Sequence, residues 1–161
     1  MGSMPEISVR AMTPAEFDHW NESTVHELAA VNVAAGNWPA DEAVDRARQS
    51  RLERLPDGVD TADMLFLLGL RPDSTPIGFL WIGLKHPRGV QDCAFLYFIE
   101  VTEAHRGSGY GRALLQAGEQ AVRARGLSSL ELNVFGANTR AVHLYETAGY
   151  TVVTQQMRKP L

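Results

Sequence analysis

The sequence has a single cysteine, no long hydrophobic run and no excess of positive charge. Cys93 cannot form a disulfide within the chain, which fits a reducing compartment. The longest apolar stretch, residues 64–70, is too short to cross a bilayer, and residues 1–5 lack the apolar segment of a signal peptide. A net charge of −4 gives no electrostatic reason to bind nucleic acid or an anionic membrane. We therefore expect a cytoplasmic protein that binds neither.

The composition is that of an ordinary globular protein, with 45% hydrophobic and 21% charged residues among 161. A chain of this length is expected to fold as one domain with its own core. Residues 1–3 are typical of an expression scar, so we expect the natural start at Met4 and one domain over residues 4–161. The five histidines show no metal-ligand spacing, and we expect no metal site.

The most informative segment is a glycine-rich stretch at residues 105–112, His-Arg-Gly-Ser-Gly-Tyr-Gly-Arg. It follows a strand-like run at residues 95–101 and precedes apolar residues at helical spacing. A glycine loop that opens a helix leaves several backbone N–H groups unpaired at the positive end of the helix dipole. Because glycine also permits close approach, such a loop suits a phosphate or pyrophosphate. We therefore predict that a phosphorylated cofactor binds here.

The spacing of the glycines narrows the choice of cofactor. A nucleoside-triphosphate loop ends in Lys-Ser or Lys-Thr, and neither follows a glycine here. A dinucleotide fingerprint needs a third glycine where Arg112 stands, although Glu131 lies twenty residues beyond Gly111, where a ribose-binding acid is expected. The dinucleotide interpretation is weak but stays open, as does a glycine-rich turn without a ligand.

Hydrophobic periodicity predicts an α/β (α+β) fold in the order β-α-α-β-β-β-α-β-α-β. The expected strands are residues 7–12, 64–70, 77–85, 92–101, 129–135 and 150–158. The expected helices are residues 14–34, residues 41–55, a helix after the glycine loop that Gly126 ends, and a short helix capped by Asn138. The strand–helix–strand unit over residues 92–135 predicts two parallel strands with a right-handed crossover. We expect a mixed central sheet with helices on both faces.

This order and two short motifs resemble the GNAT superfamily of acetyl-CoA-dependent N-acyltransferases. The family's main signature, [Q/R]-x-x-G-x-[G/A], is matched by Arg106, Gly109 and Gly111. Its second signature is an Asn that opens a short helix, a Tyr seven residues later and then Gly-[Tyr/Phe], and it is matched by Asn138, Tyr145 and Gly149-Tyr150. The resemblance extends from about residue 7 to residue 159. Residues 132–135 and 157–159 are similar to a bacterial subgroup without an assigned substrate.

The resemblance implies where acetyl-CoA binds. Backbone N–H groups of the glycine loop would hold the pyrophosphate of coenzyme A: those of Arg106, Gly107, Ser108, Gly109, Tyr110, Gly111 and Arg112. The pantetheine arm would lie along the strand that ends Ile99-Glu100-Val101, where this strand splays from the next, and Asn138 would contact it. The N–H of Val101 would polarise the acetyl carbonyl. The amine would attack the thioester directly, which agrees with the position of Cys93 too early in the strand to reach it.

The chemistry of transfer requires a base and an acid. An alkylamine with a pKa of about 10.4 is almost wholly protonated at pH 7, and removing its proton costs roughly 4.6 kcal/mol. Glu100, the only charged residue between Ala94 and Val101, is the candidate base, with Glu103 or an ordered water as rivals. Its alternative is a structural carboxylate at a strand end that pairs with an arginine or faces water. Tyr145 matches the general acid of the family, and its alternative is a core tyrosine.

The sequence leaves the acceptor open. Small polyamines, amino acids, aminoglycosides and protein amines all remain, and the resemblance also leaves open a homodimer and a non-catalytic acyl-CoA-sensing module. The family varies most in the helices that residues 14–55 correspond to, so Trp20 and Trp38 are candidates for an acceptor pocket. Trp81 is a weaker candidate, because a residue in a central strand is expected in the core.

Overall fold

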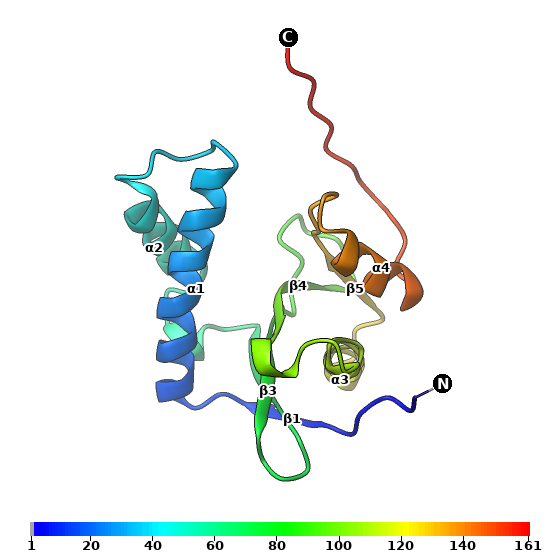
Figure 1. Ribbon diagram of the computed structural model, residues 1–161. Coiled ribbons are helices and arrows are strands. Elements are labelled where there is room, and N and C mark those ends of the chain that lie inside the picture. Colours follow the sequence, from blue (N-terminus) through cyan, green and yellow to red (C-terminus); the bar gives the residue numbers. More distant parts are fainter. Residues whose placement is uncertain (1) are drawn as a thin grey trace.

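The computed structural model describes residues 2–161, which form a mixed sheet between two helical layers (Figure 1). The elements are β1 (Ser8–Ala11), α1 (Pro14–Ala34), α2 (Ala43–Arg54), β2 (Met64–Leu70), β3 (Pro76–Gly83), β4 (Cys93–Val101), α3 (Tyr110–Ala124), β5 (Ser129–Leu132) and α4 (Thr139–Thr147). The strands lie in sequence order, and all neighbours are antiparallel except the parallel pair β4–β5. The predicted mixed α/β fold and its parallel strand pair are confirmed.

Helix α1 begins at a capping box. The Thr13 hydroxyl accepts the Glu16 N–H, the Glu16 carboxylate accepts the Thr13 N–H, and Pro14 occupies the first helical position. Buried Trp20 then packs the helix onto the sheet, with its ring 5.8 Å from those of Phe66 and Trp81. Across residues 2–161, no helix has both the length and the apolar character needed to span a membrane.

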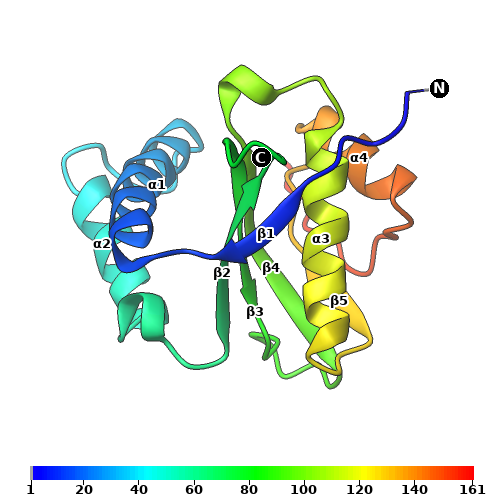
Figure 2. The ribbon, with the colours of Figure 1, turned by 90° about the horizontal axis from the view of Figure 1, so that it is seen from below.

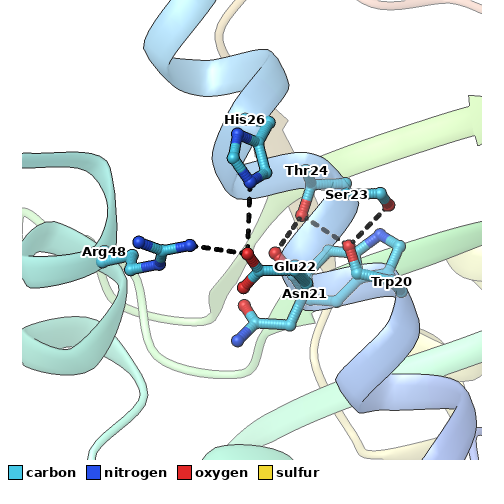
Figure 3. A network of polar contacts seen from close by, with 7 residues as sticks. All are labelled: Trp20, Asn21, Glu22, Ser23, Thr24, His26 and Arg48. Atoms are coloured by element: carbon cyan, nitrogen blue, oxygen red, sulfur yellow. Dashed lines mark hydrogen bonds and ion pairs between the residues drawn. The ribbon is translucent and has the colours of Figure 1, made fainter. Parts of the chain in front are cut away.

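Polar contacts join α2 to α1 at two depths. On the surface, Glu22 of α1 accepts hydrogen bonds from His26 at 3.1 Å and from Arg48 of α2 at 2.6 Å (Figure 3). Beneath them, buried Arg51 of α2 lies 5.0 Å from the ring centre of Trp20 and donates to Asn21 at 2.8 Å. Burial lowers the pKa of Arg51 to about 10. This guanidinium holds the α1–α2 pair to the sheet as one layer.

Helix α3 covers the opposite face of the sheet, as Figure 2 shows. It approaches closely because glycines stand at the contacts: a Cβ at Gly69 would lie 2.8 Å from Leu114, and one at Gly118 would lie 3.2 Å from Leu80. Leu80 and Leu114 are fully buried in the core between α3 and the sheet. This close packing fixes the start of α3, and the loop before it, relative to β3 and β4.

The predicted last strand, residues 150–158, is wrong. Residues 150–161 form no strand; residues 151–161 are exposed, and the segment runs away from the sheet (Figure 1). The predicted strand 129–135 also ends early, at Leu132. The residues Tyr150 to Arg158 have strand-forming chemistry, but a strand needs a neighbouring edge to pair with. Val152 and Val153 are left 68% and 67% exposed.

A tight contact between β3 and β4 leads to a stability prediction. A Cβ at Gly78 would lie 2.1 Å from the backbone oxygen of Glu100, so Gly78→Ala must push the two strands apart. We expect the free energy of unfolding in urea to fall by about 1–3 kcal/mol or more. Gly136→Ala is the matched control, because no heavy atom lies within 4 Å of its added methyl group. Equal unfolding midpoints for the two variants would contradict this packing.

Candidate active site

Strand β4 passes from one strand partner to the other along its length. Its first four residues, Cys93 to Leu96, pair with β5, whereas its pairing with β3 runs from Phe95 to Val101. Within residues 2–161, the β5-facing edge of residues 97–101 therefore has no strand partner. Such an edge presents a row of unpaired backbone N–H and C=O groups. An extended polar ligand can pair with it as a strand would.

A β-bulge lies where the free edge begins. Trp81 of β3 is opposite Phe98 and Ile82 is opposite Leu96, so Tyr97 is the extra residue. Beyond the bulge, Glu100 is directly opposite Phe79, and directly opposed residues share one face of a sheet. Phe79 faces α1, where it lines a cleft with residues of that helix. The side chain of Glu100 is therefore on the α1 face, at the end of the unpaired edge.

The glycine loop follows at the end of β4. Gly107 and Gly109 have φ angles of 81° and 85°, a left-handed conformation that favours glycine. Gly109 is the N-cap of α3 and supplies no side chain to bond the first N–H groups of the helix. Among the described residues, the N–H groups of Gly107 to Arg112 have no hydrogen-bond acceptor. The N–H of Arg106 differs, because it donates to Glu103 O at 3.3 Å.

The side chain of Arg106 turns back to β4 rather than into the loop. Its Nε donates to Val101 O at 3.0 Å, and its Nη2 donates to Glu100 Oε1 at 3.1 Å. Glu100 is thus the arginine-paired carboxylate considered as the structural alternative, yet it stays partly exposed on the α1 face. Burial and the negative charge of Glu27 raise the pKa of Glu100, and the Arg106 charge opposes the rise. Because the Glu100 carboxylate is partly exposed, it can bind a second group besides Arg106.

Helix α4 brings the second motif to the loop. The Asn138 side chain accepts the Ala141 N–H at 3.2 Å and so caps the helix, as predicted. One turn from the helix end, Leu144 lies 3.5 Å from the position of a Cβ on Gly111. The next residue, Tyr145, is 9% exposed, and burial alone raises the pKa of its hydroxyl. That hydroxyl has no hydrogen-bond partner among residues 2–161, in contrast to Tyr150, which donates to Glu119 at 3.0 Å.

A cleft of about 320 Å³ lies between α1 and the sheet, next to the end of β4. Its lining residues are Met12, Glu16, His19, Trp20, Ser23, Leu68, Pro76, Phe79 and Thr102. Of the three tryptophans considered from the sequence, Trp20 lines this cleft. Trp81 is buried in the core, as predicted, whereas Trp38 does not line the cleft and packs against the cluster of buried residues around Ala43. His19, Ser23 and Phe79 were not identified from the sequence. The sequence pattern that could have indicated His19 and Ser23 is their i, i+4 spacing, which places them on the same face of α1 as Glu16.

Three residues far apart in sequence form a group that was also missed. His86, Cys93 and Glu131 have ligand atoms within 4.8 Å of one another, a composition that can suit a metal ion. However, His86 Nδ1 accepts the Arg88 N–H at 3.0 Å, which places the ring proton on Nε2 and leaves that nitrogen no free lone pair. His86 Nε2 lies 3.1 Å from Glu131 but outside hydrogen-bond geometry, and Arg88 also contacts this carboxylate. These donors do not fit a metal ion.

Comparisons with known proteins agree with this geometry. Residues 21–150 match the model of the acetyltransferase (GNAT) family. The chain is 32% identical over 155 residues to the uncharacterized N-acetyltransferase YdgE of Bacillus subtilis (strain 168), covering 96% of this chain and 98% of that one. The crystal structure of the acetyltransferase YycN from Bacillus subtilis superposes with a TM-score of 0.87 at 31% identity, covering 97% and 99%.

A more distant solved structure shares the fold. The PaiA N-acetyltransferase of Thermoplasma acidophilum, solved in complex with coenzyme A, has a TM-score of 0.65 at 20% identity and covers 94% of this chain and 93% of that one.

The ion pair formed by Glu16, which lines the cleft, leads to a prediction on stability and pH. Arg10 contacts both oxygens of Glu16, at 2.7 and 2.8 Å, and with the Thr13 N–H this lowers the pKa of Glu16 to about 2. Because the folded-state pKa is below the ordinary value of 4.5, the stabilisation is full above that value and is lost as the pH falls toward 2. Glu16→Gln should therefore lower the urea midpoint at neutral pH, and the difference from the parent should shrink through this range.

The control is Glu146→Gln, which replaces an exposed carboxylate that makes no ion pair within residues 2–161. A Glu16→Gln difference that stays constant from neutral pH down to pH 2 would contradict the role of the Arg10–Glu16 pair.

Proposed function

This chain belongs to the GNAT family of acetyltransferases, and we propose that it moves an acetyl group from acetyl-CoA to a primary amine by direct attack in a ternary complex. The observation that carries the proposal is the unpaired edge of β4 over residues 97–101, which ends beside the free N–H groups of the glycine loop. An edge that pairs with an amide-containing arm and a loop that binds a pyrophosphate suit the two parts of coenzyme A.

The residues present fit this co-substrate. The N–H groups of Gly107 to Arg112 would bind the pyrophosphate, and the backbone of Ile99 and Val101 would bind the arm, with Asn138 beside it. Arg106 contributes through its side chain, which fixes the Val101 carbonyl and the Glu100 carboxylate. When bound, acetyl-CoA supplies an activated acyl group as a thioester. The Val101 N–H would donate to the acetyl oxygen and stabilise the negative charge that develops there.

Glu100 is the proposed base. It extends from the end of the unpaired edge toward α1, the side from which an acceptor in the cleft would approach. Burial and Glu27 raise the pKa of its carboxyl, which brings the group closer to the operating pH and makes it a better proton acceptor. Arg106 keeps the carboxylate in place. Glu100 would take the proton from the acceptor ammonium before attack.

Tyr145 is the proposed acid. Its ring is buried in α4 next to the helix turn that contacts the glycine loop, and its hydroxyl is free to donate. Burial raises the pKa of this hydroxyl, so the proton is retained at neutral pH. A thiolate leaving group, with a pKa of about 8.5, gains from a proton donated as it departs.

Replacing Tyr145 tests the assignment of the acid. Tyr145→Phe removes one oxygen atom and keeps the buried ring, so we expect turnover to fall more than tenfold while the dissociation constant of coenzyme A changes little. Tyr150→Phe is the matched control, because its hydroxyl is bound to Glu119. Turnover unchanged in Tyr145→Phe would remove this residue from the mechanism.

The proposed function is tested by release of free thiol from acetyl-CoA in the presence of a panel of amines. Binding alone should stabilise the protein, by about 2.7 kcal/mol at a hundredfold excess of acetyl-CoA over its dissociation constant. Only an enzyme releases thiol in an amine-dependent manner. Stabilisation without thiol release by any amine would instead identify a module that senses acyl-CoA.

A further inference from the structure

The cleft between α1 and the sheet defines what kind of amine this site can hold. We propose that the acceptor is a small monoamine with an apolar body, which lies in this cleft with its ammonium group between Glu27 and Glu100. The inference rests on the proposed function and names the substrate class for the same site. Three features support this inference: the size of the cleft, its apolar walls and the partly neutralised negative charge next to it.

The first feature is the size of the cleft. Its volume of about 320 Å³ is at the lower end of the range for ligand pockets and equals roughly ten water molecules at about 30 Å³ each. A body the size of one aromatic ring with a short chain fits within such a space, because a cavity of about 150 Å³ already holds benzene. An aminoglycoside with several sugar rings would extend beyond the cleft.

The second feature is the apolar character of the walls. Trp20 of α1, Leu68 and Phe79 of the sheet, and Met12 after β1 all line the cleft. Phe98 continues this surface, with its ring 6.0 Å from Phe79 and 5.6 Å from Trp20. Phe79 and Phe98 are only half-buried, so both rings keep accessible apolar surface. A ligand with an apolar body gains free energy by covering that surface.

The third feature is the location of the negative charge. Glu16 lines the cleft, but Arg10 neutralises its carboxylate through two hydrogen bonds. Glu27 is one helical turn beyond Ser23 on the same face of α1, and its charge acts on Glu100 of β4. Neither carboxylate lines the cleft itself, but Glu27 follows the lining residue Ser23 by one turn and Glu100 is directly opposite the lining residue Phe79. The two like charges next to the cleft repel each other, and among the described residues Arg106 pairs with Glu100 whereas Glu27 makes no ion pair. An ammonium ion placed there relieves the repulsion.

This charge pattern separates the candidate acceptors. A polyamine would place its second ammonium among Trp20, Leu68 and Phe79, where the one acidic side chain of the lining is already paired. An α-amino acid would bring its own carboxylate next to Glu27 and Glu100. A monoamine has neither a second ammonium nor a carboxylate, so it avoids both of these unfavourable interactions. The rings of Phe79 and Phe98 also favour its cation.

The test measures kcat/KM for 2-phenylethylamine, phenylalanine, spermidine, kanamycin and a lysine-containing peptide. We expect 2-phenylethylamine to exceed each of the others at least tenfold. Phenylalanine is its matched partner, because the two differ by one carboxylate. If any of the other four is acetylated as well as or better than 2-phenylethylamine, the inference is overturned and the proposed function stands. If no amine releases thiol, the proposed function is overturned and the inference with it.

Two variants place the amine in the cleft. Ser23→Phe fills the cleft from an exposed helix position, so we expect KM for 2-phenylethylamine to rise at least tenfold while KM for ethylamine, which lacks the ring, changes less than threefold.

Glu27→Gln should raise KM for both amines alike, because both carry the ammonium. Leu52→Ala is the control, since Leu52 is exposed on α2 outside the cleft. The coenzyme A dissociation constant should be the same in all four proteins and shows that each is folded. If Ser23→Phe raised KM equally for the two amines, the proposed position of the apolar body in the cleft would be wrong.

Discussion

The site depends on one constraint: β4 and β5 stay paired for four residues and then separate. Backbone groups in the interior of a sheet are normally satisfied by both neighbours, and here one neighbour ends at Leu132. The bulge at Tyr97 starts the unpaired half and directs Phe98 and Glu100 toward α1. The same five residues thus present backbone groups at the edge and side chains on the face. In the proposed mechanism, acetyl-CoA and the acceptor would meet at Val101 and Glu100 without competing for the same groups.

The two helical layers stabilise this arrangement in different ways. On the α3 side, glycines let the helix approach the sheet, so Leu114 fills the core and the start of α3 is held rigidly. On the α1 side, contact is made by large aromatic rings around Trp20 and by the buried guanidinium of Arg51. Close packing fixes the position of the glycine loop relative to the sheet. The large rings on the α1 side leave a cleft beside that helix, where the proposed acceptor would bind.

Features set by short-range hydrogen bonds could be predicted from the sequence. The Thr13 cap, the glycine loop that opens α3, and the Asn138 cap depend on residues within a few positions, and β2 was predicted to its exact ends. The parallel pair β4–β5 was also predicted, but other features that need a distant partner were not. Strand-forming residues after Tyr150 do not reveal whether an edge is available to them. Likewise, the His86 group and the cleft arise only when separate segments meet in the fold.

The partial pairing of β4 also predicts two different rates of amide hydrogen exchange along this strand. The amide hydrogens of Phe95 and Leu96 lie between two strands and are released only by opening the sheet. From Tyr97 to Val101, amides that point toward β3 remain protected, and those that point toward the missing neighbour have no strand partner. Protection should therefore alternate from residue to residue along this half of the strand. The amides that exchange fastest in the free protein are the ones that a ligand along the edge would cover.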